Sequence, residues 1–173
     1  HLGVRRQRQM CIRDSLMATT IPNCISYDPT YSYELATIIS SGMKRMFEDG
    51  ENVFYYITTM NENYVHPDMP EGVEEGIVRG LYPLKKSTKK GKKRVQLMSA
   101  GTIMREVEAA AVILEKDYGV AADIWSMTSV NELARDGHKV SRRNMMNPAV
   151  EPEVPYVTQC LSPTEGPIIA ATD

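Results

Sequence analysis

The sequence has few cysteines and no long apolar run, and both absences limit what the chain can be. Its three cysteines, Cys11, Cys24 and Cys160, are odd in number and far apart, which argues against a disulfide framework and a C-x-x-C metal site. No run approaches the about 18 apolar residues that a membrane-spanning helix needs. No apolar segment of the signal-peptide kind follows the early arginines. We therefore expect a cytoplasmic protein that neither crosses a membrane nor depends on disulfides.

Several well-known functional motifs are also missing. The chain contains no G-x-G-x-x-G, no G-K-[ST] phosphate loop, no zinc-ligand spacing and no Ser-His-Asp order, and it has only three histidines. The residues alone therefore predict no metal ligand. Candidate chemistry is confined to polar clusters that follow predicted strands.

The first fifteen residues, HLGVRRQRQMCIRDS, have no helical or strand periodicity. They permit two interpretations, a basic arm that binds nucleic acid or a non-native segment, and RRQRQMCIRDS resembles a translated sequencing adaptor. We predict a non-native segment at residues 1–15. It carries four of the 20 basic and one of the 22 acidic side chains, so the remainder has 16 and 21 and a formal charge of −5. That acidic balance argues against nucleic acid as a partner.

Alternating strand and helix patterns predict an α/β fold. Residues 21–27 and 52–60 read as strands, and residues 31–48 between them have apolar side chains at helical spacing. Strand, helix and strand in this order form a βαβ unit with a parallel pair. Later segments predict further elements: helices at 73–79, 102–118 and 131–146, strands at 95–100 and 121–130, and an edge strand with Pro155 at 154–161.

Residues 84–94, LKKSTKKGKKR, carry seven positive charges. The segment fits either a nucleic-acid contact or a solvated linker or hairpin. No aromatic residue is interleaved with the charges, and dense like charges repel each other and stay hydrated. We predict a basic linker or hairpin at residues 85–94. A second hypothesis is a non-catalytic interaction module that holds an acidic partner through Lys89, Lys90, Lys92 and Lys93.

The loop NENYVHP, residues 61–67, follows a predicted strand directly. Functional loops lie at the carboxyl ends of parallel strands, and a histidine beside a carboxylate can move protons near neutral pH. Glu62 and His66 are therefore candidate catalytic residues, and Tyr27, at the end of the preceding strand, is a candidate for the same cavity. The alternative is that the polar side chains of this loop only satisfy backbone groups at a turn.

Three long stretches beyond residue 15 resemble one enzyme family. They read IPNCISYDPTYSYELATII, ENVFYYITTMNENYVHPDMPEGVEEGI and DIWSMTSVNELARDG, and they resemble the homodimeric type of pyruvate dehydrogenase E1 component. The resemblance implies a transketolase-like fold in two partial domains, with mainly parallel sheets and helices on both faces. Residues 16–84 would form the later part of the pyrimidine-binding middle domain, and residues 95–173 the first part of the C-terminal domain.

The same resemblance implies a function. The family decarboxylates pyruvate on thiamine diphosphate with Mg²⁺ and reductively acetylates the lipoyl group of its E2 partner. It implies that His66 and Glu62 act in catalysis, that Tyr27 contacts the cofactor, and that a second subunit completes the cavity. The diphosphate and metal motif of the family is not in this sequence, so those ligands are expected outside it. We therefore expect a piece of a longer enzyme, inactive alone, and the same chemistry on another 2-oxo acid remains an alternative.

Overall fold

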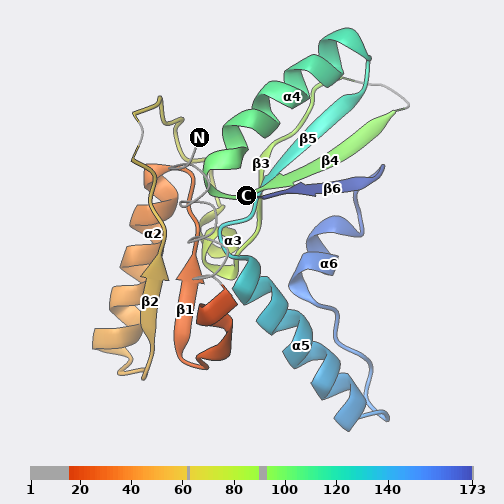
Figure 1. Ribbon diagram of the computed structural model, residues 1–173. Helices are drawn as coiled ribbons and strands as arrows, with labels where there is room; N and C mark the ends of the chain where they lie inside the picture. The colour runs from red at the N-terminus through yellow and green to blue at the C-terminus, as the bar shows by residue number, and fades with distance from the viewer. Residues whose placement is uncertain (1–15, 62, 90–92, 173) are drawn as a thin grey trace.

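Strands and helices alternate along the chain and build two sheets (Figure 1). The computed structural model describes residues 16–61, 63–89 and 93–172. The first sheet pairs β1 (Cys24–Tyr27) with β2 (Phe54–Ile57) in parallel. The second has the order β3-β5-β4-β6, and only β3 runs antiparallel to its neighbour. Its strands are β3 (Tyr82–Lys85), β4 (Arg94–Ser99), β5 (Ala121–Ser126) and β6 (Ile168–Ala171).

The helices connect these strands and cover them. Their bounds are α2 (Ser32–Met43, continued by a π-helical turn, Lys44–Glu48), α3 (Glu74–Arg79), α4 (Met104–Asp117, after a 3₁₀ turn, Gly101–Ile103), α5 (Val130–Met146) and α6 (Tyr156–Leu161). The predicted α/β class with mainly parallel strands is confirmed. No helix in the described part of the chain is both long enough and apolar enough to cross a membrane.

The second sheet is buried on both faces because its central strands place apolar residues on each side. Val95 and Leu97 of β4 pack in one core with Val107 of α4. Met98, next along the same strand, packs in another core with Leu161 of α6. This arrangement is typical of parallel strands that are covered by helices on both faces.

Residues 154–161 were predicted as an edge strand, and that prediction is wrong. Pro155 instead caps α6, with φ −58° and ψ 148°. Proline is tolerated at the start of a helix because the first N–H groups have no intrahelical partner. Val157 and Leu161, four residues apart, pack on the core side. The edge strand next to β4 is β6, which the sequence analysis did not identify.

The predicted linker, residues 85–94, has strand residues at both ends. Lys85 closes β3 and Arg94 opens β4. β3 lies in the second sheet, although residues 16–84 were assigned to the first domain. Lys89 Nζ donates a hydrogen bond to the Glu115 carbonyl near the end of α4. Residues 90–92 lie outside the described residues, so the domain boundaries and the basic linker stay predictions.

Gly80 ends α3 at a point where the chain packs against the start of α5. Its φ is +100°, and a Cβ there would lie 2.6 Å from the Ser129 carbonyl oxygen. Gly119 also has a positive φ, +65°, but nothing lies within 4 Å of its Cβ position. Both sites carry the backbone penalty for a side chain, and only Gly80 adds a clash with another backbone segment.

Gly80→Ala is therefore expected to lower the free energy of unfolding by about 2 kcal/mol more than Gly119→Ala does. Urea unfolding followed by the fluorescence of Trp125, the one tryptophan of the chain, measures both variants. Equal losses in the two variants would contradict the packing argument.

Candidate active site

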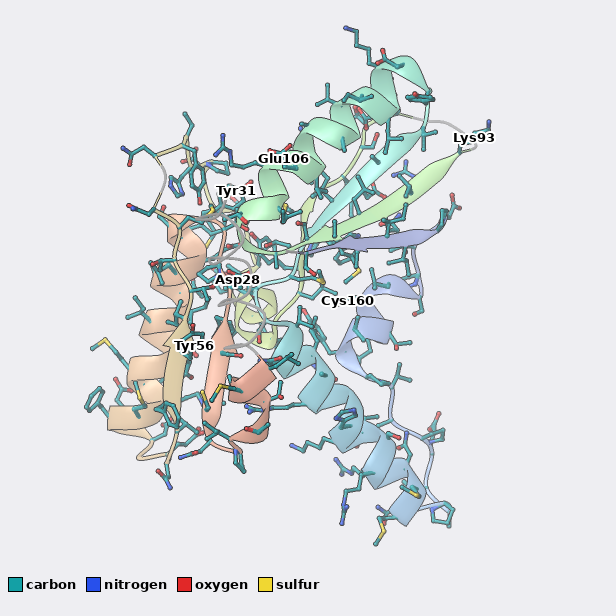
Figure 2. All side chains as sticks on the ribbon, in the orientation of Figure 1. Asp28, Tyr31, Tyr56, Lys93, Glu106 and Cys160 are labelled. Carbon is teal, nitrogen blue, oxygen red and sulfur yellow. The ribbon has the colours of Figure 1, made fainter. Side chains whose placement is uncertain are left out.

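The carboxyl ends of the two sheets face each other. The Asp28 N–H, just after β1, donates to the Thr128 carbonyl beyond β5 at 2.8 Å, and the Gly101 N–H, just after β4, donates to the Asp28 carbonyl at 3.3 Å. Thr58, just after β2, donates its hydroxyl to the Asp28 carboxylate. Figure 2 shows Asp28 and Tyr31 between the two sheets. The loops that follow parallel strands therefore converge, which is where such folds place functional groups.

His66 lies beside this region in a cluster of aromatic side chains. Its ring stacks on Tyr64, with centroids 4.4 Å apart and planes 24° from parallel, and meets Tyr31 edge-on at 6.1 Å. Its Nδ1 accepts a hydrogen bond from the Ser32 N–H at 3.0 Å. His66 is exposed in this chain. The second ring nitrogen, Nε2, is therefore the atom through which His66 can meet a substrate.

Tyr31 is the buried member of the cluster. It is 3% exposed, and among the described residues its hydroxyl has no hydrogen-bond partner of good geometry. Burial raises the pKa of Tyr31, and the nearby Glu108 carboxylate raises it further. Tyr31 therefore keeps its proton and can donate a hydrogen bond, for which the Glu108 carboxylate is a nearby acceptor.

Glu34 lies in the first turn of α2 and is fully buried. Oε2 accepts hydrogen bonds from the backbone N–H groups of Thr30 and Tyr31, the latter at 2.9 Å. Oε1 accepts from the Tyr82 hydroxyl of β3 and the Ser126 hydroxyl of β5, both at 2.6 Å. Burial raises the pKa of Tyr82 and Glu34 raises it further, so the phenol remains the donor. One side chain therefore joins the turn before α2 to the second sheet.

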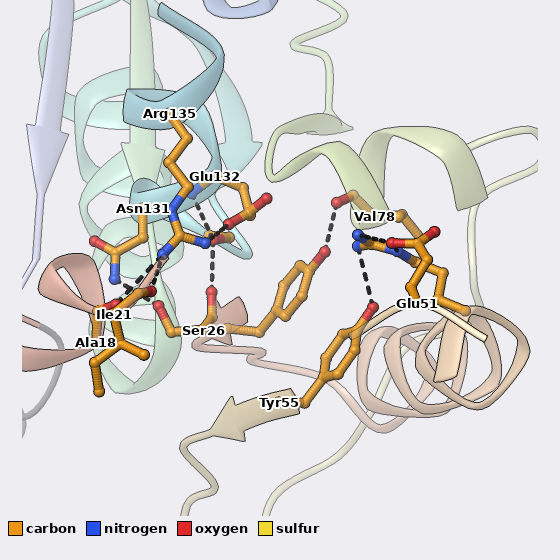
Figure 3. Close-up of polar contacts among 12 residues, drawn as sticks. Ala18, Ile21, Ser26, Glu51, Tyr55, Val78, Asn131, Glu132 and Arg135 are labelled. Carbon is orange, nitrogen blue, oxygen red and sulfur yellow. Dashed lines mark hydrogen bonds and ion pairs between the residues drawn. The ribbon is translucent and has the colours of Figure 1, made fainter. Parts of the chain in front are cut away.

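Tyr27, the predicted cofactor contact, is 4% exposed. Its hydroxyl donates to the Val78 carbonyl at 2.6 Å, the bond that Val78 accepts in Figure 3. Its ring stacks on Tyr55, with centroids 6.0 Å apart. Burial raises the pKa of Tyr27, so it too keeps its proton. The described contacts place Tyr27 with the core of the first sheet and not with His66.

The third predicted site residue, Glu62, lies outside the described residues. Sequence reasoning missed Tyr31, Tyr64 and Glu34. A glutamate at the third position of a helix is a signal for capping. It was overlooked because the residue that precedes the helix as its N-cap, Tyr31, is not one of the usual small polar caps.

Helix α5 contacts β1 of the first sheet. Figure 3 shows the polar contacts in this region. The Asn131 amide donates to the Ser26 hydroxyl. Arg135 donates to the Ala18 and Ile21 carbonyls at 3.3 and 3.0 Å. These bonds fix the position of β1 and therefore of the loop that begins at Asp28.

A hollow of about 380 Å³ lies on the α6 side of the second sheet. Its buried polar groups already satisfy one another: Trp125 donates to Gln96 at 2.8 Å, Gln96 to Asp123 at 3.0 Å, and Arg94 to Asp123 at 2.6 Å. Burial alone would raise the pKa of Asp123, but hydrogen bonds from Arg94, the Ser87 N–H and Gln96 outweigh it, and the pKa is lowered. We therefore interpret this network as one that stabilises the fold.

Asp123 should therefore stabilise the fold in a pH-dependent way. A lowered folded-state pKa contributes stability above the unfolded value of about 3.9, and this stability is lost as the pH falls through the folded value. Asp123→Asn is expected to cost about 2 kcal/mol at pH 7, and the difference from wild type should shrink below about pH 4. Urea unfolding at several pH values, with the exposed Asp68→Asn as control, measures this. A constant difference from pH 7 to about pH 3 would contradict it.

Comparison with known proteins identifies the family. Residues 3–67 match the pyruvate dehydrogenase E1 component middle domain, and residues 80–173 match the transketolase-like TK C-terminal domain. The chain is 54% identical over 158 residues to the pyruvate dehydrogenase E1 component of Pseudomonas aeruginosa, covering 91% of this chain and 18% of that protein. The chain belongs to the pyruvate dehydrogenase E1 family. The E1 component of Escherichia coli is 52% identical over 159 residues, with the same shares of the two chains covered.

The fold of this E1 chain resembles that of transketolase. Two solved transketolase variants from Pichia stipitis superpose with TM-scores of 0.56 and 0.54 at 15% and 16% identity, covering 87% and 86% of this chain and 18% of each of theirs. The predicted transketolase-like fold is confirmed. The chain spans less than a fifth of the length of the E1 relatives named above. The middle-domain match begins at residue 3, inside the segment predicted to be non-native, so that prediction stays untested.

Proposed function

We propose that the chain is part of an E1 subunit that decarboxylates pyruvate on thiamine diphosphate and transfers the acetyl group to a lipoyl group. The observation that carries the proposal is the 54% identity to an E1 component over nearly the whole chain. The structure supports it, because the strand ends converge beside a cluster that contains an exposed imidazole, His66. No comparable observation favours the interaction-module hypothesis.

The described residues fit the ring end of the cofactor. Tyr31 offers a buried hydroxyl without a partner of good geometry, and Tyr31, Tyr64 and His66 offer aromatic surface. Thiamine diphosphate, when bound, would supply the electron sink for decarboxylation. Among the described residues, no group of three or more His, Cys, Asp or Glu side chains forms a metal site. We therefore assign the Mg²⁺ and diphosphate ligands to the rest of the full-length protein.

His66 would orient the acyl oxygen and exchange a proton through Nε2 during acetyl transfer. Glu62, four residues earlier, would share that proton or position the loop. Tyr27 would support the cavity from behind, through its ring and its bond to Val78, because its hydroxyl is already used there. Tyr31 would donate a hydrogen bond to the cofactor ring.

The proposal includes partners. A second E1 subunit would complete the cavity, and the lipoyl domain of E2 would receive the acetyl group in the cytoplasm. Ile39 and Met43 of α2 are 45% and 55% exposed, and Phe47 beyond them is 78% exposed. An exposed apolar row of this kind is typical of a surface that another protein segment covers.

The test is an assay of the full-length protein that contains this chain. With thiamine diphosphate, Mg²⁺ and a lipoyl domain, it is expected to consume pyruvate and acetylate the lipoyl group. Longer 2-oxo acids serve as competing substrates, and a preference for one of them would favour the alternative substrate class. Absence of both decarboxylation and acetyl transfer with every 2-oxo acid would overturn the proposal.

A further inference from the structure

We infer that the first turn of α2 fixes the tautomer of His66, so that the neutral imidazole carries its proton on Nε2. Ser32, through its backbone N–H, and Glu34 are then positioning residues for His66. The assignment of His66 to the reaction rests on the proposed function, whereas the tautomer rests on geometry alone.

The hydrogen bond to Nδ1 decides the tautomer. The Ser32 nitrogen lies 3.0 Å from Nδ1, and a backbone N–H can only donate. Nδ1 must therefore offer a lone pair, and the proton of the neutral ring is on Nε2. The other tautomer would set two hydrogens against each other. His66 consequently presents a donor to the substrate side, suited to an acyl oxygen.

Ser32 has a free N–H because it is the first residue of α2. The first N–H groups of a helix have no intrahelical acceptor. Glu34 Oε2 takes the N–H groups of Thr30 and Tyr31, so the next donor in the turn, Ser32, remains for His66. Thr30 and Tyr31 thus share Glu34 Oε2 as their acceptor, and Ser32 has Nδ1 of His66.

The orientation of the imidazole is held from the same turn. Tyr64, on which the ring stacks, donates its hydroxyl to the Thr30 carbonyl, and Tyr31 meets the ring edge-on. Glu34 in turn is held by Tyr82 and Ser126. The chain of contacts therefore runs from the second sheet through Glu34 and residues 30–32 to the imidazole.

Ser32→Pro removes this N–H and little else. Proline is well tolerated at the first position of a helix. The preceding residue must be extended, and Tyr31 already is, with φ −113° and ψ 153°. Ser32→Ala is the matched control, because it removes the hydroxyl and keeps the N–H. In the full-length enzyme, kcat for lipoyl acetylation is expected about tenfold lower in Ser32→Pro than in Ser32→Ala, with a similar KM for pyruvate. Equal kcat values would overturn the positioning role.

The tautomer has its own readout. Carbon–nitrogen correlation NMR of the full-length protein with labelled histidine, with the His66 signal assigned by its loss in His66→Gln, is expected to show protonated Nε2 in wild type and Ser32→Ala. Ser32→Pro should lose that preference. Protonated Nδ1 in the wild type would overturn the inference. Protonated Nε2 together with full activity of His66→Ala would support the tautomer and instead overturn the catalytic role of His66.

Discussion

His66→Ala in the full-length protein is expected to slow acetyl transfer to the lipoyl group about 100-fold, because general acid–base groups contribute at least that much. Its effect on stability should stay below about 1 kcal/mol, since exposed side chains contribute little to folding. Steady-state kinetics with a lipoyl domain, combined with urea unfolding, separates the two effects. The expected result is an enzyme that is folded and slow.

His138→Ala is the matched control for His66→Ala. His138 is also exposed, but it lies on α5, away from the contacts that hold His66. Its replacement is expected to leave turnover within about twofold of wild type. If His66→Ala turned over pyruvate and acetylated the lipoyl group as fast as His138→Ala, the role assigned to residues 61–67 would be wrong.

Glu34→Ala is expected to lower the free energy of unfolding by about 3–5 kcal/mol, because each buried group that loses its hydrogen-bond partner costs about 1–3 kcal/mol. The substitution removes an acceptor shared by four donors, and two of them, Tyr82 and Ser126, are themselves almost completely buried. An unsatisfied buried donor is costly because it has lost water and gained nothing in return.

Two further variants make this prediction specific. Glu34→Gln keeps the shape and one acceptor oxygen, so its loss should be smaller. Glu75→Ala removes an exposed carboxylate that pairs with Arg79 at 3.3 Å, and such pairs contribute about 0–1 kcal/mol. Unfolding in urea, followed by Trp125 fluorescence, ranks the three. If Glu34→Ala lowered the free energy of unfolding no more than Glu75→Ala does, the stabilising role assigned to Glu34 would be wrong.

The elements predicted well are those that local pattern determines. The apolar spacing of residues 31–48 gave α2, and the β-branched and aromatic run at 52–60 gave β2. Residues 154–161 failed because Pro155 fits both an edge strand and a helix start, and only the packing of Leu161 on the second core decides between them. β6 was missed because its partner, β4, lies some 70 residues earlier, and nothing local indicates that pairing.

The candidate site also has features that follow from the local sequence and features that depend on distant contacts. The position of His66 after a strand follows from order along the chain, and the family follows from resemblance, which the comparisons confirm. The surroundings of His66 do not follow, because the bond from Ser32 joins residues 34 apart. The bond from Ser126 to Glu34 joins residues 92 apart. Tyr27 shows how far the local sequence can predict a position. Its place at the end of a strand suggested a cavity, but a hydrogen bond to Val78, 51 residues away, determines where its hydroxyl lies.

The four hydrogen bonds that Glu34 accepts also restrict how the two sheets can move apart. Any hinge between the two sheets would pull Tyr82 and Ser126 away from Glu34 and leave a buried carboxyl group with fewer hydrogen-bond partners, which is costly for a buried polar group. Substrate entry and product exit by parting the sheets is therefore disfavoured. A molecule that reaches His66 would therefore approach from the side of the exposed imidazole.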